Sequence, residues 1–191
     1  MPALPERGRR RARVTSAAPQ RNGDIDHTPV ARGHLNLLAL VTLPVLALDQ
    51  LSKHLVATEL ALHSSIVIVP GWLDLTYTLN PGAAFSLFAT MPAGFRRVFF
   101  VALSVAAIIV LTVLIARRTT SLASAVAFAL ILGGALGNLY DRLARGVVID
   151  FIYFHHAWFS YPVFNLADSA ITIGVALVLL LSAFTRSPVN N

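Results

Sequence analysis

Two aspartates, Asp150 and Asp168, are the residues of this chain whose type and position most clearly suggest chemistry. Asp150 interrupts an apolar run, and Asp168 lies at the head of a long apolar segment. A carboxylate in hydrocarbon surroundings is costly, so each acid is a candidate functional residue. Two acids that meet in a poorly hydrated site cannot both ionise easily, and the proton they share permits general acid–base chemistry. The chain between them is short enough for them to meet.

A second acid and a cation occur at Asp49 and Lys53, near the end of the first apolar segment. Their i, i+4 spacing with the acid first is the favourable order for an ion pair on a helix. Two interpretations are open: a structural pair that neutralises both charges, or a pair that positions a catalytic group.

Asn138, Asp141 and Arg142 follow three glycines, of which Gly133 and Gly137 form a GxxxG pair and Gly134 lies between them. The i, i+3, i+4 spacing places the three polar residues on one helix face. Small residues allow helices in a membrane to approach closely. The pattern indicates either helix packing with an Asp–Arg pair, or a polar face that orients a site, with Arg142 on a lipid phosphate or a backbone carbonyl.

Asn165 and Asp168 are spaced i, i+3 at the start of the last apolar segment. Capping of that helix would suit Asn165 better than Asp168, and the helix dipole favours a negative charge on Asp168. The segment from Asn80 to Ser86 is either a simple turn or a stretch whose free backbone groups pair with an extended peptide.

Other chemistries find little support. The chain has no cysteine, which excludes disulfides, thiolate catalysis and thiolate metal sites. His155 and His156 are adjacent and no HExxH motif is present, so we predict an interfacial loop there and no metal. The serines Ser86, Ser160 and Ser169 have no nucleophile motif around them. We therefore expect no metal and no cofactor.

The composition indicates an integral membrane protein. Of 191 residues, 56% are hydrophobic and only 13% are charged, and the mean hydropathy is +0.70. Residues 1–33 are polar and basic, and we predict a disordered cytoplasmic tail. The arginines of this tail account for much of the net charge of +6, and no nucleic-acid-binding module follows them, so we expect no nucleic-acid partner.

Four segments are apolar and long enough to cross a bilayer. They are about Leu35 to Val56, Val98 to Ala116, Leu122 to Tyr140 and Phe164 to Phe184. With both termini in the cytoplasm, ten of the fifteen Lys and Arg lie on the cytoplasmic side. This topology places all the polar candidates near the outer face, including Asp49, Asp150 and Asp168.

The first outer segment, about residues 62–90, has the pattern of a strand. From Leu73 to Leu79 apolar residues alternate with Asp74, Thr76 and Thr78. Ile66 to Val69 could pair with it across a Pro-Gly turn. The predicted fold is therefore an all-α membrane protein with four transmembrane helices, cytoplasmic N and C termini, and a small β-sheet at the periplasmic face.

Five motifs, in order and with similar spacing over about residues 36–185, resemble bacterial lipoprotein signal peptidase (signal peptidase II). They are Asp49-Gln50-Leu51-Ser52-Lys53, Asn80-Pro81-Gly82-Ala83-Ala84-Phe85-Ser86, Gly133 to Arg142, Val148-Ile149-Asp150-Phe151 and Phe164 to Ser169. The tail lies outside the resemblance.

The resemblance implies a four-span aspartyl endopeptidase domain, residues 34–186, in the bacterial inner membrane, followed by a short cytoplasmic tail, 187–191. Its partner would be a diacylglyceryl-modified prolipoprotein, cleaved before the lipidated cysteine, with membrane lipid around it. The oligomeric state is left open. Asp150 and Asp168 match the catalytic pair, and the residues that match site-shaping positions are Asp49, Lys53, Asn80, Gly134, Asn138, Arg142 and Asn165; the helix-face pattern adds Asp141.

The mechanism we expect uses one ionised aspartate to take a proton from water and one protonated aspartate to donate to the scissile carbonyl. Asn138 and Asn165 would hydrogen-bond the carboxylates, and the helix dipole makes Asp168 the more readily ionised. The main alternative is a small proton-coupled transporter, although relay acids are usually spread through the membrane. A GxxxG-based adaptor would not explain the clustered acids. A GxGD-type intramembrane protease lacks its motif here.

Overall fold

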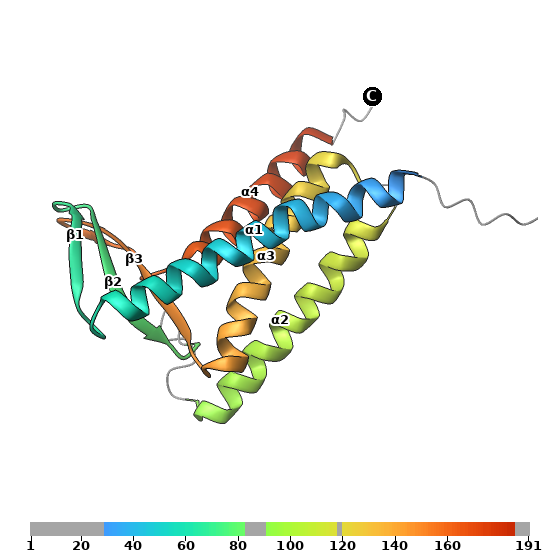
Figure 1. The fold of residues 1–191 in the computed structure, drawn as a ribbon. Helices are drawn as coiled ribbons and strands as arrows, with labels where there is room; N and C mark the ends of the chain where they lie inside the picture. Colours follow the sequence, from blue (N-terminus) through green and yellow to red (C-terminus); the bar gives the residue numbers. More distant parts are fainter. Residues whose placement is uncertain (1–28, 83–90, 118–119, 186–191) are drawn as a thin grey trace, which may run out of the picture.

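Four long helices make up most of the structure, a computed structural model that describes residues 29–82, 91–117 and 120–185. They are α1 (Pro29–Glu59), α2 (Ala93–Ala116), α3 (Leu122–Ala144) and α4 (Leu166–Thr185). All four are long and apolar enough to cross a membrane, which confirms the four predicted spans. Figure 1 shows them as a bundle that opens toward a small sheet at one end.

The largest differences from the predicted boundaries lie at two helix starts and one helix end. α1 begins at Pro29, so residues 29–33 are helical and do not belong to the tail, of which residues 1–28 lie outside the described part. α2 begins at Ala93, ahead of the predicted Val98. α3 continues to Ala144, which places Asp141 and Arg142 inside the helix.

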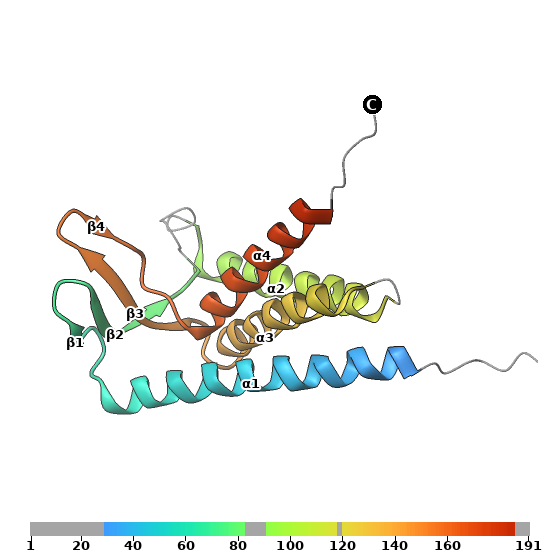
Figure 2. The same ribbon diagram turned by 90° about the horizontal axis from the view of Figure 1, so that it is seen from above.

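The helix α3 is the centre of the bundle and packs against each of the other three helices, as Figures 1 and 2 show. Its glycines make these approaches possible. A Cβ added to Gly133 would lie 2.8 Å from the side chain of Val45 on α1, and one added to Gly134 would overlap the carbonyl oxygen of Ala167 on α4. The predicted packing role of the GxxxG segment is therefore confirmed.

A four-stranded antiparallel sheet stands at one end of the bundle, in the order β1 (Ser65–Val69), β2 (Leu73–Asn80), β3 (Val148–His156) and β4 (Phe159–Ser160). The predicted pairing of the first two strands is confirmed, with Ile66 opposite Leu75. The strands β3 and β4 were missed. The first four residues of β3 are all buried, so its sequence lacks the alternation that reveals a half-exposed strand.

The outer surface of the bundle is apolar, and part of its interior is polar. Large apolar side chains point outward, for example Leu103, Ile109 and Leu179, each more than half exposed. Among the largest fully buried side chains are Lys53 and Asp49. Lipid would solvate the outer apolar surface, and the interior holds small residues and paired polar groups beside apolar side chains such as Ile115 and Leu132.

Candidate active site

The two aspartates come from different elements that meet where the sheet joins the bundle. Asp150 is on β3, opposite Thr78 of β2, and Asp168 is in the first turn of α4. After β3 the chain turns back, and the backbone N–H groups of Phe151 and Ile152 both donate to the carbonyl oxygen of Phe164, at 3.0 and 2.8 Å. This return brings the start of α4 beside the strand β3 (Figure 1).

Asp150 is buried, with 2% of its surface exposed. Its Oδ1 accepts a hydrogen bond from Nδ2 of Asn165 at 2.7 Å, and its Oδ2 accepts one from Nδ2 of Asn80 at 3.0 Å. Burial, and then the negative charge of Asp168, raise the pKa of Asp150 to about 7, against the opposing effects of the two amides and of Lys53. At neutral pH this carboxyl therefore holds a proton for part of the time.

Asp168 is partly exposed and accepts hydrogen bonds on both oxygens. Nδ2 of Asn138 donates to Oδ1 at 2.7 Å, and the backbone N–H of Asn165 donates to Oδ2 at 3.3 Å. The backbone N–H of Asp168 in turn donates to Oδ1 of Asn165 at 2.9 Å. Asn165 and Asp168 thus form a reciprocal cap on α4, which confirms Asn165 as the capping residue and adds Asp168 to the cap.

Two asparagine amides connect the carboxyl groups of the two acids. Nδ2 of Asn165 lies 3.2 Å from Oδ1 of Asn138 and also donates to Asp150, while Asn138 donates to Asp168. Both asparagines are buried. The expectation that Asn138 and Asn165 hydrogen-bond the carboxylates is confirmed.

A buried cluster of charged side chains contacts the elements that carry these two acids. Nζ of Lys53 lies 2.8 Å from Oδ2 of Asp49 and 2.9 Å from Oδ2 of Asp141, and all three side chains are fully buried. The other oxygen of Asp49 accepts the backbone N–H of Ala167 at 2.9 Å. The Asp49–Lys53 pair predicted from the spacing is confirmed, and it also holds the first turn of α4, which carries Asp168.

The predicted pairing of Asp141 with Arg142 is wrong. Asp141 pairs with Lys53 and with Arg145, one helical turn further on, because the neighbouring residue projects from the helix in another direction. Arg142 donates to the backbone carbonyl of Asn138 at 3.2 Å, and its guanidinium lies 5.3 Å from the ring centroid of Phe100. A backbone carbonyl was one of the two ligands expected for Arg142.

Two residues of the cluster were missed from the sequence. Nε2 of Gln50 lies 3.1 Å from Oδ2 of Asp49 and 3.3 Å from Oδ1 of Asp141, and Oε1 of Gln50 accepts from Arg145. The i, i+4 spacing of Asp141 and Arg145 was a readable signal. Nothing in the sequence marked Gln50, because its partners other than the adjacent Asp49 come from a helix far along the chain.

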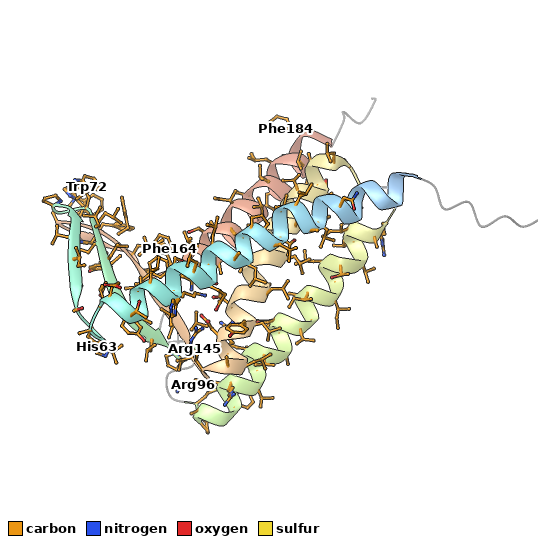
Figure 3. All side chains as sticks on the ribbon, in the orientation of Figure 1. His63, Trp72, Arg96, Arg145, Phe164 and Phe184 are labelled. Carbon is orange, nitrogen blue, oxygen red and sulfur yellow. The ribbon has the colours of Figure 1, made fainter. Side chains whose placement is uncertain are left out.

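The two histidines lie in the sheet, away from Asp150 and Asp168. They close the strand β3, so the predicted loop at this point is wrong. Nε2 of His155 lies 3.1 Å from Oδ2 of Asp74, and the ring of His156 stacks on Trp72 with centroids 3.9 Å apart. Figure 3 shows Trp72 at the far tip of the sheet. These contacts hold strands together.

A groove of about 440 Å³ opens beside Asp168 between the sheet and α4. Aromatic and apolar side chains form most of its wall, and Asp168 is the one charged residue among the described residues that line it. These residues are Phe154, Phe159, Tyr161, Phe164, Asp168, Ser169, Thr172 and Ile173. Figure 3 shows Phe164 where the sheet meets the bundle. The groove can therefore hold an apolar group against one acid of the pair.

Comparison with known proteins agrees with this geometry. Residues 41–184 match the family model described as Signal peptidase (SPase) II. The lipoprotein signal peptidase of Desulforapulum autotrophicum is 42% identical over 154 residues, which cover 79% of this chain and 94% of that protein. The lipoprotein signal peptidase of Paraburkholderia phymatum is 48% identical over 139 residues, covering 73% and 82%.

Among solved structures, a bacterial membrane enzyme determined by the in meso method at 2.3 Å resolution superposes with a TM-score of 0.69. It is 29% identical, and the match covers 82% of this chain and 94% of that one. A second, at 1.9 Å resolution, gives a TM-score of 0.68 at 30% identity, covering 81% and 96%. The chain is a multi-pass membrane protein of the signal peptidase II family, the aspartic peptidases that process lipoproteins.

Proposed function

We propose that Asp150 and Asp168 are the catalytic pair of this peptidase and that its substrate is a diacylglyceryl-modified prolipoprotein, cut on the N-terminal side of the lipidated cysteine. The observation that carries the assignment is the chain of amides from Asp150 through Asn165 and Asn138 to Asp168. It links an acid on β3 with an acid in the first turn of α4. The relatives are named lipoprotein signal peptidases, which supports a lipoprotein precursor as the substrate.

The environments of the two acids divide their roles. Asp150 is buried with its pKa near 7 and so supplies the protonated carboxyl. Asp168 lies in the first turn of α4, accepts two N–H groups and lines the open groove, so it faces water and substrate. Asp168 takes a proton from water as the water oxygen bonds to the scissile carbonyl carbon. Asp150 donates its proton to the carbonyl oxygen.

Collapse of the resulting tetrahedral intermediate breaks the C–N bond. The leaving amine receives the proton held by Asp168, and the proton of the former carbonyl oxygen returns to Asp150, so both acids regain their starting states. Each general acid or base contributes about 10²–10⁴-fold to the rate.

Other site residues support this reaction in our proposal. Asn80 holds the second oxygen of Asp150. Gly134 lets α4 approach α3, because a side chain there would overlap Ala167. Arg142 lies within electrostatic reach of Asp168 and Asp150 and would bind a substrate carbonyl or a lipid phosphate.

The groove beside Asp168 would hold the apolar part of the substrate. It passes from the sheet to Thr172 and Ile173 on α4, and Ile173 is 54% exposed on the outer, apolar surface of the bundle. A lipid chain or apolar peptide side chain can therefore enter from the membrane without crossing water. The sheet offers backbone pairing to an extended peptide, which a transmembrane helix does not.

For the membrane topology we propose cytoplasmic termini, with the sheet and the site at the periplasmic surface of the inner membrane. The support is the distribution of Lys and Arg in the sequence. In this arrangement the basic residues 1–28 stay in the cytoplasm as a tail.

The test is cleavage of a diacylglyceryl-modified prolipoprotein by purified Asp150→Asn and Asp168→Asn. Each change should lower kcat by at least 10² while the variant keeps the thermal unfolding profile of a folded protein. Asp74→Asn, an acid of the sheet that pairs with His155, is the matched control and should keep full activity.

If folded Asp150→Asn or folded Asp168→Asn cleaves the substrate at the normal rate, the proposed acid–base roles of the two aspartates are wrong. The transporter alternative predicts a different result. It would gain support if the unmodified chain failed to cleave and instead gave pH-dependent flux in proteoliposomes.

A further inference from the structure

Lys53 makes one contact that charge neutralisation does not explain. Its ammonium group donates to Asp49 at 2.8 Å, lies 2.9 Å from Asp141, and donates to Oδ1 of Asn138 at 3.0 Å. An ammonium has three N–H donors, so each donor has a partner. Two carboxylates already balance the buried cation. The third donor is directed at a neutral amide that also contacts a proposed catalytic acid.

The neighbours of Asn138 determine which way its amide faces. The oxygen accepts from Lys53 and lies 3.2 Å from Nδ2 of Asn165, while Nδ2 donates to Oδ1 of Asp168 at 2.7 Å. Rotation of the amide by 180° would place its NH₂ group against two donors and its oxygen against a carboxylate. The bond from Lys53 is charge-assisted and therefore the stronger of the two that hold the oxygen.

We propose that Lys53 is a positioning residue for the reaction: by holding the amide oxygen of Asn138, it keeps the amide N–H group on Asp168. The inference rests on the proposed catalytic pair. An N–H donor favours the ionised form of a carboxylate, so this contact keeps Asp168 ready to accept a proton from water. Lys53 thereby affects the reaction from a fully buried place behind the site.

The test is the pH–rate profile of Lys53→Met, which keeps the unbranched apolar part of the side chain and removes the ammonium group. We expect kcat to fall about tenfold and the acid limb to move to higher pH by about half a unit to one unit, with KM nearly unchanged. The limb moves upward because loss of a donor to the ionised form makes ionisation of the pair harder. A role in folding alone would lower stability and leave the limb in place.

Charge must be separated from orientation, because Lys53 also lowers the pKa of Asp150 through its field. The charged groups around it are Asp49 on the same helix, Asp141, Arg142 and Arg145 on α3, Asp150 on β3 and Asp168 on α4. The double variant Lys53→Met/Asp141→Asn removes one charge of each sign. It should retain the upward shift. A return of the wild-type profile in this variant would overturn the proposal.

A double-mutant cycle with Asn138→Ala gives a second criterion. If Lys53 acts through Asn138, adding the charge-balanced pair Lys53→Met/Asp141→Asn to Asn138→Ala should leave the acid limb where Asn138→Ala alone puts it. Independent shifts that add would contradict the proposal. Activity lost in Asp150→Asn but an unchanged profile in Lys53→Met would refute positioning while the proposed function stands; activity retained in Asp150→Asn would refute the function itself.

A measurement on the unmodified protein decides the point even if the variants fail to fold. In ¹⁵N-asparagine-labelled protein in micelles, the side-chain NH₂ protons of Asn138 should show contacts to the Hβ protons of Asp168. Contacts to the Hε protons of Lys53 in their place would show the opposite amide orientation and overturn the proposal.

Discussion

The helices α2 and α3 have nearly the same length, 24 and 23 residues, but opposite surroundings. α2 is the more apolar and buries only Leu111 and Ile115. α3 buries ten residues, among them three glycines, Asn138 and Asp141. In a membrane the more hydrophobic helix faces lipid and the less hydrophobic one fills the interior, because apolar side chains gain nothing by leaving lipid. Of these two helices, α3 therefore carries most of the buried residues and the polar side chains of the site.

The largest effect we expect is from removal of the acid that ties α1 to α4. Asp49→Ala leaves Lys53 with one carboxylate fewer and the backbone N–H of Ala167 without its acceptor. Breaking a buried ion pair costs about 3–5 kcal/mol. Thermal unfolding in detergent should show the loss. Asp74→Ala, whose partner is the partly exposed His155, is the control and should cost under about 1 kcal/mol.

The same substitution on α2 and α3 should give opposite results. Gly134→Ala inserts a Cβ that would overlap the carbonyl oxygen of Ala167, so the first turn of α4 must shift. We expect a loss of about 1–3 kcal/mol and at least tenfold lower activity. A Cβ at Gly94 on α2 meets nothing within 4 Å, so Gly94→Ala should be neutral or slightly stabilising. Equal losses at both positions would contradict the contrast.

On the strand β3, burial disfavours the negatively charged form of Asp150. Because burial raises its pKa to about 7 from 3.8, the folded state holds a proton that the unfolded state releases above pH 4. The contribution of Asp150 to stability therefore falls as pH rises from about 4 to 7 and stays low above that.

Asp150→Asn should remove this decline and be the more stable protein at pH 8, by about 1–2 kcal/mol. The check is the difference in unfolding free energy between variant and wild type at pH 5 and pH 8. If the difference in unfolding free energy does not grow with pH, ionisation of Asp150 does not destabilise the folded state.

The smallest effect is expected at the edge of the charge cluster. Arg145 contacts Asp141, but its side chain is 33% exposed, in contrast to the fully buried Lys53. Arg145→Gln should cost under about 1 kcal/mol, and added salt should reduce the difference, since solvent already screens this ion pair. Titration with salt during thermal unfolding measures both. If Arg145→Gln lost as much stability as Asp49→Ala, the greater exposure of Arg145 would not make its ion pair weaker than that of Lys53.

Local patterns predicted the parts of this protein that depend on one element. Continuous apolar runs gave the four helices, because length and hydropathy decide which segments suit lipid. Alternation gave β2, and i, i+4 spacing gave the pair of Asp49 and Lys53. The same rule applied to Asp141 would have given Arg145. The strand β3 was not predicted, because burial on both faces removes the alternation of apolar and polar residues. Gln50 was not predicted as a site residue, because most of its contacts are long-range.

The sequence by itself determined the class of chemistry: two acids in apolar surroundings, no cysteine, and asparagines at helical spacing from acids. Only the tertiary structure decided which groups touch. The amides of Asn165 and Asn138 meet because β3 and α4 converge and the glycines of α3 let α4 come close. Hydrogen bonds require alignment to a few tenths of an ångström, and across separate elements packing alone sets that alignment. The different surroundings of Asp150 and Asp168 follow from the same packing.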